Sequence, residues 1–520
     1  MKLDEDAPQA DTEDAMDKDP RLPKRKVAVL IGYSGHGYKG MQLNPPHPTI
    51  EGDLFEAFVQ AGAISRANSN DPKKSSLVRC ARTDKGVHAA GNVISLKLII
   101  EDPDIVAKIN SFLPDQIRVW GIMRTLGSFN CYQMCDSRIY EYVIPTHVFL
   151  PPNPRSYLGK TMRAQAEESG DLDGYESRQE ECAGFWVTVQ EEIQKLLEDK
   201  GHTTVDLDAA AECEEVELNK PPPGAIPEKK SLDGTDAVPA GTETEEAQQQ
   251  PPQQGLPQEI LKQVKALTME HKRAFRIPSI RLERLRNVLK NYVGTHNFHN
   301  YTVSKSPSDP SAMRHIKSFV ASDPFLINGV EYLSLKVHGQ SFMMHQIRKM
   351  IGMALLLVRC GTRISLIRDS YEKSNVLPIP KAPGIGLLLE RPVFESYNKK
   401  CAGFGRELVA FDGFQKEMDS FRETFIYGRM WQQESREDVF GQFVGFVDGY
   451  RSEAFCYLGS KGVKAIEEAR LRGGYGLGGG KEVRILEEDG EEEEVADDEE
   501  ERDGGEGGGG GKRGKKGRRG

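Results

Sequence analysis

Charge is spread very unevenly along this 520-residue chain, and that limits where a folded core can form. The net charge is −10. Residues 1–20, 161–260 and 481–520 carry −6, −17 and −6, so the rest of the chain carries +19. Segments of high net charge and low hydrophobicity cannot bury enough apolar surface to fold. We therefore expect a strongly basic folded body interrupted by acidic segments, which is the electrostatic signature of a protein that binds phosphate backbones.

The acidic segments also predict the domain boundaries. We expect, in order, a disordered acidic N-terminus (1–22), a first folded subdomain (23–160), an acidic and largely disordered insertion (161–258), a second folded subdomain (259–398), a helical C-terminal extension (399–474) and a disordered Gly-rich, acidic and basic tail (475–520). Both folded parts contain a helix, strands and a polar loop. The sequence thus predicts an α/β (α+β) protein built from two related subdomains, with antiparallel or mixed sheets backed by helices.

Composition argues against membrane and disulfide-rich classes. No stretch approaches the roughly 20 apolar residues that span a bilayer, and the N-terminus is acidic, unlike a secretory or transit signal. The eight cysteines contain no Cys-x-x-Cys pair, so we predict free thiols and no zinc site. These features predict a soluble intracellular protein.

The segment Arg79–Asn92 places one carboxylate, Asp84, on a turn between cations. Lys85-Gly86 follows it directly, and a strand-like apolar run begins at Val93. Neighbouring cations favour the ionised carboxylate, and polar turns on rigid strands are where catalytic groups are usually held. The alternative is that Asp-Lys-Gly only closes a hairpin.

A glycine pattern, Gly35-x-Gly37-x-x-Gly40, follows the predicted first strand over residues 26–33 and suggests dinucleotide binding. The pyrophosphate would need a helix that starts at this loop. Pro45, Pro46 and Pro48 forbid such a helix, so a nucleotide-dependent oxidoreductase is the weaker interpretation.

Two further groups of residues are candidates for a site. Tyr140 and Tyr142 share one face of a predicted strand. In a helix predicted from about Met343, the residues His345, Arg348 and Lys349 share a basic face. A cross-strand aromatic and an ordinary basic surface are the respective alternatives.

Residues 81–89, Ala-Arg-Thr-Asp-Lys-Gly-Val-His-Ala, closely resemble the active-site signature of the TruA-type tRNA pseudouridine synthases, and most of all their eukaryotic multisite-specific branch. The loop Tyr33-x-Gly-x-x-Tyr-x-Gly-x-Gln42 and the Phe342, Arg348, Gly352 spacing resemble further family motifs. The resemblance implies that Asp84 is the catalytic nucleophile. It also implies that Tyr140 stacks on the target base, that Arg82 helps to hold the flipped nucleotide, and that Arg348 pairs with Asp84.

The resemblance further implies a basic cleft between the subdomains and conversion of uridine to pseudouridine in tRNA, with small nuclear RNA and mRNA as further substrates. The expected sites are in the anticodon stem region, intron-containing precursors included. No cofactor or metal is required, because the reaction is a redox-neutral isomerisation. We expect a monomer or weak oligomer, and the basic cluster at 512–519 suggests the nucleus. A non-catalytic RNA-binding protein on the same fold is the main alternative.

Overall fold

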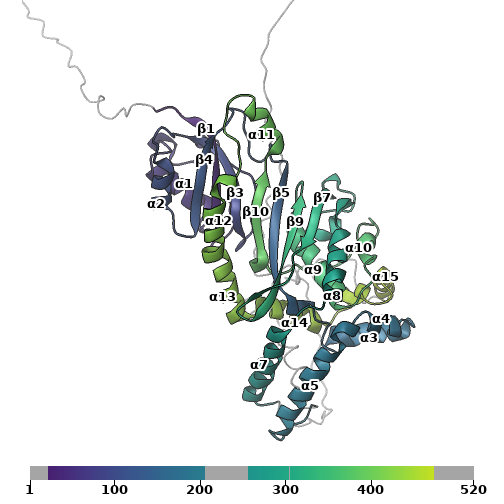
Figure 1. The fold of residues 1–520 in the computed structure, drawn as a ribbon. Coiled ribbons are helices and arrows are strands. Elements are labelled where there is room, and N and C mark those ends of the chain that lie inside the picture. Colours follow the sequence, from purple (N-terminus) through teal and green to yellow (C-terminus); the bar gives the residue numbers. More distant parts are fainter. Residues whose placement is uncertain (1–21, 205–255, 304, 473–520) are drawn as a thin grey trace, which may run out of the picture. The chain divides into compact units, whose positions relative to one another are not determined.

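One mixed β-sheet runs through both halves of the chain (Figure 1). The computed structural model describes residues 22–204, 256–303 and 305–472. The strands are β1 (Arg25–Tyr33), β2 (Val78–Arg79), β3 (His88–Leu98), β4 (Ile117–Arg124), β5 (Ser137–Pro145), β6 (Gly294–Asn297), β7 (Met313–Ala321), β8 (Phe325–Ile327), β9 (Val330–Gly339) and β10 (Leu387–Val393). Their order in the sheet is β4-β1-β3-β10-β5-β9-β7-β6, with β2 paired to β3 and β8 to β9.

The helices belong to four regions of the chain. The first half carries α1 (Ile50–Gln60) and α2 (Ile105–Phe112), and the second half carries α8 (Ser279–Lys290), α9 (Gln346–Arg359) and α10 (Leu366–Asp369). The insertion between the halves contains most of α3 (Tyr157–Glu168), α4 (Leu172–Ser177) and α5 (Ala183–Glu198), and α7 (Gln258–Ala274) begins at its end and runs into the second subdomain. The C-terminal extension contains α11 (Glu395–Ala402), α12 (Gln415–Phe421), α13 (Gly428–Glu437), α14 (Val439–Gly449) and α15 (Val463–Leu471).

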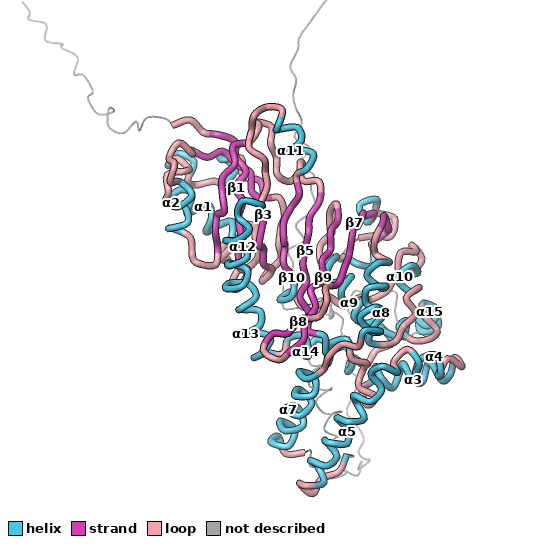
Figure 2. Tube along the Cα trace, viewed as in Figure 1, coloured by secondary structure: helices cyan, strands magenta, loops and turns pink. Residues whose placement is uncertain are grey.

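The predicted mixed α/β class with a helical C-terminal extension is confirmed. The arrangement differs from two separate sheets, because the strands of both halves form one group (Figure 2). The strand β10 comes from the second half of the chain and joins the two sides of the sheet. It pairs in parallel with β3 and antiparallel with β5. The other strand pairs are antiparallel among the described residues.

The C-terminal extension covers one face of the sheet. Ala28 and Leu30 of β1 alternate with residues of the opposite face and pack in a buried cluster with Phe411, Met418 and Phe421. Both faces of β1 are therefore covered, and its central residues are fully buried. This burial explains why the first strand reads as a continuous apolar run rather than an alternating one.

The insertion is more ordered over its first part than its acidic composition predicted. Residues 157–198 contain α3, α4 and α5. Apolar residues of α5, such as Val189 and Ile193, pack against Ile260 and Val264 of α7. An amphipathic stripe stabilises a helix even where its other face is strongly acidic. Gly241–Gln254 lies outside the described residues, as do most of 1–22 and all of the tail from 475.

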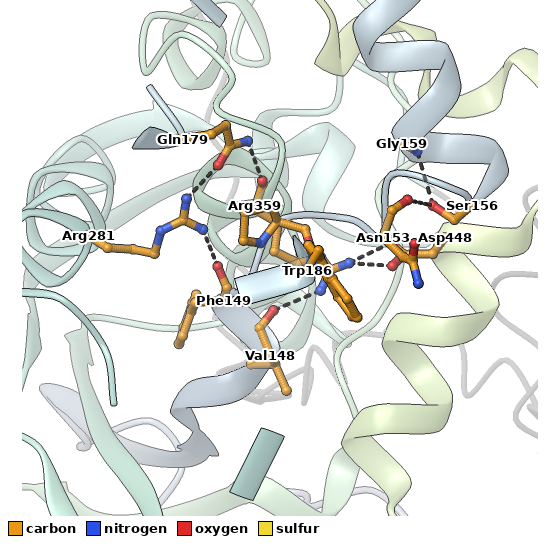
Figure 3. Close-up of polar contacts among 11 residues, drawn as sticks. Val148, Phe149, Asn153, Ser156, Gly159, Gln179, Trp186, Arg281, Arg359 and Asp448 are labelled. Atoms are coloured by element: carbon orange, nitrogen blue, oxygen red, sulfur yellow. Dashed lines mark hydrogen bonds and ion pairs between the residues drawn. The ribbon is translucent and has the colours of Figure 1, made fainter. Parts of the chain in front are cut away.

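Buried arginines attach the insertion and the extension to the body (Figure 3). Arg281 of α8 donates to Gln179 Oε1 and to the Phe149 carbonyl, and Gln179 Nε2 donates to the Arg359 carbonyl at 2.6 Å. At the end of α9, Arg359 donates to both carboxylate oxygens of Asp448 in α14 at 2.6 Å. These buried polar contacts fix the insertion, the second half of the chain and the C-terminal extension to one another around Arg281 and Arg359.

Candidate active site

Asp84 lies in the segment that connects β2 to β3, just before the end of β3 that pairs with β10. The strands β3 and β10 pair over only two residues, His88 with Leu388 and Ala89 with Leu389. Further along β3, β2 pairs with Ile94 and Ser95, while β1 occupies the other edge. After β2 the chain continues beside β3, because the Cys80 N–H donates to the Val93 carbonyl at 2.8 Å. Asp84 is thus held between strands of both halves, close to β10, which joins the two sides of the sheet.

Buried side chains fix the backbone on the approach to Asp84. The Tyr33 hydroxyl lies 2.9 Å from Thr83 Oγ1, and Asn92 Nδ2 donates both to Tyr33 and to the Ala81 carbonyl. The turn closes after Asp84, because the Val87 N–H donates to the Asp84 carbonyl at 3.2 Å. The carboxylate therefore projects from a rigid loop, which a catalytic group requires.

The glycine loop after β1 is a scaffold for this segment. A Cβ on Gly35 would lie 2.3 Å from the Val87 carbonyl oxygen, and one on Gly40 would lie 2.8 Å from that of Thr83. The Met41 N–H donates to the Thr83 carbonyl at 3.1 Å. No helix opens at this loop, since α1 begins only at Ile50. The glycines serve close backbone approach, and the dinucleotide-binding interpretation is wrong.

Three basic side chains act on the Asp84 carboxylate. His345 Nδ1 lies 3.2 Å from Asp84 Oδ2, and Arg348 and Lys381 act on Asp84 electrostatically. Burial alone would raise the pKa of Asp84. The contact with His345 and the positive charges of Arg348 and Lys381 outweigh burial and lower that pKa. Asp84 is therefore ionised at neutral pH, although only 35% of its side chain is exposed.

Close packing of α9 on the segment 380–384 brings Arg348 and Lys381 together. A Cβ on Gly352 would lie 2.2 Å from the Pro380 carbonyl oxygen. Arg348 Nε donates to the Ala382 carbonyl at 2.7 Å, and the Ala382 N–H donates back to the Arg348 carbonyl at 3.2 Å. Gly352 of the predicted motif therefore permits the contact that orients Arg348.

Tyr140 of β5 is buried beside the site. Its ring meets Phe342 edge-on, with centroids 5.3 Å apart, and it is close enough to Asp84 for that charge to act on its hydroxyl. Burial raises the pKa of Tyr140 far above its ordinary value, against the opposing effect of Arg138. The hydroxyl is accordingly neutral at any working pH and can donate a hydrogen bond.

Arg138, two residues before Tyr140, connects the two loops that form the site. Its side chain donates to the Cys80 carbonyl at 2.8 Å and to the Gln340 carbonyl at 3.4 Å. Cys80 starts the segment with Asp84, and Gln340 starts the segment with His345. A buried guanidinium with several donors can fix two backbone strands at once.

Of the predicted residues, the structure brings Asp84, Tyr140 and Arg348 together, whereas the Arg82 side chain is exposed. No role of its own was predicted for His345, and Lys381 and Arg138 were not predicted to lie in the site. His345 had been placed on the basic face of the helix with Arg348, which was the available signal. The helix begins at Gln346, three residues later than predicted, because His345 adopts a left-handed conformation.

In the described part of the chain, one group of three side chains has ligand atoms close enough to share a metal ion: His147, Glu434 and Asp438. The cations Lys272 and Arg273 act on Asp438 from α7. Positive charges in these positions compete with a metal ion, and we assign no metal there. No helix among the described residues is long and apolar enough to cross a membrane.

Comparison with known proteins identifies the class to which this fold and site belong. A family model described as tRNA pseudouridine synthase matches residues 288–395. The chain is 46% identical to tRNA pseudouridine synthase 1 of Yarrowia lipolytica over 472 residues, covering 90% of this chain and 83% of the relative. It is 44% identical to tRNA pseudouridine synthase 1 of Saccharomyces cerevisiae, covering 83% and 73%. It is 34% identical to tRNA pseudouridine synthase 2 of Schizosaccharomyces pombe, covering 84% and 95%.

The class is thus that of the pseudouridine synthases, which are isomerases. Within it, the chain belongs to the TruA-type tRNA pseudouridine synthases, and its similarity to the eukaryotic synthase 1 proteins extends over most of its length.

Proposed function

We propose that this enzyme converts uridine to pseudouridine in tRNA, with Asp84 as its catalytic nucleophile. The observation that carries the proposal is the site itself: an ionised carboxylate on a rigid loop, 3.2 Å from His345 and in the field of Arg348 and Lys381. An anionic nucleophile needs compensating charge when it works inside a protein. The names of the relatives, all tRNA pseudouridine synthases, support tRNA as the substrate.

The chemistry is an isomerisation whose atoms balance without a cofactor. The bond from N1 of uracil to the sugar breaks, the base turns, and C5 bonds to the same sugar carbon. C5 loses one proton and N1 gains one, so no electron is gained or lost overall. In this scheme Asp84 acts at the nucleotide and Tyr140 stacks on the base, with its neutral hydroxyl in position to handle the C5 proton.

Arg82 contributes before the chemistry in this proposal. The target base must leave its stack, which costs a few kcal/mol. Arg82 is exposed and lies two residues before Asp84, so its guanidinium can hold the flipped nucleotide or fill the space it leaves. Basic side chains elsewhere on the body contribute backbone contacts that set the register of the RNA.

We also propose the anticodon stem region as the main target, including intron-containing precursors, with small nuclear RNA and mRNA as further substrates. The +19 charge of the body outside the acidic segments supports broad RNA binding, because backbone contacts do not depend on sequence. A nuclear location follows from the basic cluster at 512–519 and suits these substrates. The proposed state in solution is a monomer or weak oligomer.

The test maps pseudouridine on an unmodified tRNA transcript by carbodiimide-induced reverse-transcription stops. Asp84→Asn should abolish the stops and leave tRNA affinity within several-fold of wild type, because only the charge of one side chain changes. Asp115→Asn is the matched control: Asp115 pairs with Arg118 at the surface, with 82% of its side chain exposed. Full turnover by Asp84→Asn would falsify the role of Asp84. Tight binding without product on any RNA class, even by the wild type, would favour the non-catalytic alternative.

A further inference from the structure

His345 occupies an unusual position for the side chain nearest to Asp84. Its ring is almost fully buried, with 2% of the side chain exposed. Its backbone is left-handed, with φ 56° and ψ 3°, directly before the first residue of α9. Four non-glycine residues among those described have a positive φ, and His345 is the one that contacts Asp84.

The left-handed conformation costs roughly 1–2 kcal/mol for a residue with a Cβ, whereas glycine adopts it freely. A histidine in this conformation is retained where the surroundings enforce it, and such strain concentrates at functional sites. The side chain, rather than the backbone, is therefore the reason for a histidine here.

Hydrogen bonds on both sides of His345 enforce this geometry. The Met343 N–H donates to Gln346 Oε1 at 2.9 Å, and the Thr302 hydroxyl donates to the Met344 carbonyl at 3.0 Å. Lys349 Nζ donates to the Thr302 carbonyl at 3.1 Å. The turn before α9 is thus attached to Thr302 as well as to its own helix, and it holds the imidazole in a fixed direction.

Arg348 has a different orientation. Its Nε is directed at the Ala382 carbonyl, so part of the guanidinium holds the segment 380–384. Arg348 acts on Asp84 through its charge, and His345 places its Nδ1 3.2 Å from Asp84 Oδ2. The imidazole is thus within ion-pair distance of the carboxylate.

We propose that His345 is the positioning residue of this active site: its imidazole, with Nδ1 3.2 Å from Asp84 Oδ2, holds the carboxylate in one rotamer, which leaves Oδ1 for the nucleotide. The inference rests on the proposed function of Asp84. It assigns to His345 an orienting role, with no transfer of its proton in the reaction. A misplacement of about 1 Å at a reacting group costs up to 10²-fold in rate, which is the scale of effect expected when the imidazole is removed.

The test compares three replacements of His345 in the full-length enzyme, by single-turnover rate and by tRNA affinity. His345→Ala and His345→Gly should lower the rate about 10- to 100-fold with affinity nearly unchanged. His345→Asn should recover most of the rate, since asparagine tolerates the left-handed conformation and its amide nitrogen can take the place of Nδ1 beside Asp84. Asn328→Gly, another left-handed position, in the turn between β8 and β9, is the control and should leave the rate unchanged.

Stability separates positioning from a purely structural role. His345→Gly relieves backbone strain, so its Tm should equal or exceed that of the wild type while its rate falls. A large drop in Tm in parallel with the rate would instead overturn the proposal. Equal loss of rate in His345→Asn and His345→Ala would also overturn it, because that result requires proton transfer by the imidazole.

A thermodynamic cycle tests the contact without reference to activity. Asp84→Asn, His345→Ala and the double variant are melted without RNA. Shifts in Tm that do not add in the double variant support the contact, and additive shifts contradict it. The cycle still decides the proposal if the wild type makes no pseudouridine, whereas that result would count against the proposed function alone.

Discussion

Tyr140 shows how burial changes what one side chain can do. Its pKa is raised by burial, so the phenol holds its proton and the ring is available for stacking. Tyr140→Phe keeps the edge-on contact with Phe342 and removes only the hydroxyl. If the hydroxyl handles the C5 proton, the single-turnover rate should fall about 10²-fold or more, with tRNA affinity unchanged.

The control for Tyr140→Phe is Tyr132→Phe. Tyr132 is 62% exposed and also lies near Arg138, so the same chemical change is made outside the buried site. A wild-type rate in Tyr140→Phe would restrict Tyr140 to stacking.

Individual residues also show what sequence reasoning could and could not find. Asp84, Tyr140 and Arg348 were found because each lies in a continuous motif with a recognisable pattern. His345 and Lys381 come close to Asp84 only because β3 and β10, about 300 residues apart in sequence, pair in parallel. The left-handed turn at His345 depends on hydrogen bonds to Thr302 and between its neighbours, which no local pattern encodes.

At the scale of elements, the contact between α9 and the segment 380–384 is a sensitive point. Gly352→Ala places a Cβ 2.2 Å from the Pro380 carbonyl oxygen, so the helix and the segment must separate. We expect a loss of about 1–3 kcal/mol in the free energy of unfolding and a lower rate, because Arg348 and Lys381 then move relative to Asp84. Denaturant titration and single-turnover assays measure the two effects.

Gly445→Ala in α14 is the matched helical control. Nothing lies within 4 Å of a Cβ at Gly445, so alanine should stabilise the helix by about 0.5–1 kcal/mol. Destabilisation by both substitutions would mean that helix propensity, and not the approach of Pro380, decides the outcome.

The insertion shows the same limit of sequence reasoning at this scale. Its acidic composition predicted disorder, and the amphipathic stripes of α3 and α5 overcome that composition over 157–198. Those stripes bury apolar surface against other elements, such as Val189 of α5 against Val264 of α7. Net charge describes the solvent face of such a helix and says little about the face it buries.

At the scale of the molecule, the ion pair between Arg359 and Asp448 connects the body to the extension. Asp448→Asn leaves a buried guanidinium without its counter-charge, and we expect a loss of about 3–5 kcal/mol in stability. The double variant Arg359→Met, Asp448→Leu removes both charges and should recover most of that loss. Thermal melts of the wild type and the two variants measure both effects, and equal losses in the two variants would contradict an electrostatic origin.

The position of β10 also has a consequence for the birth of the protein on the ribosome. The strand that joins the two halves of the sheet is the last to be translated, and the segment that carries Lys381 directly precedes it. The emerging N-terminal half holds Asp84 but lacks β10, β9 and α9, so both edges of β5 and the His88–Ala89 end of β3 stay unpaired until residue 393 has left the exit tunnel. Long-range pairing of this kind makes folding slow and leaves strand edges exposed in the meantime. The nascent chain is consequently inactive, with strand edges open to aggregation, until residue 393 has emerged.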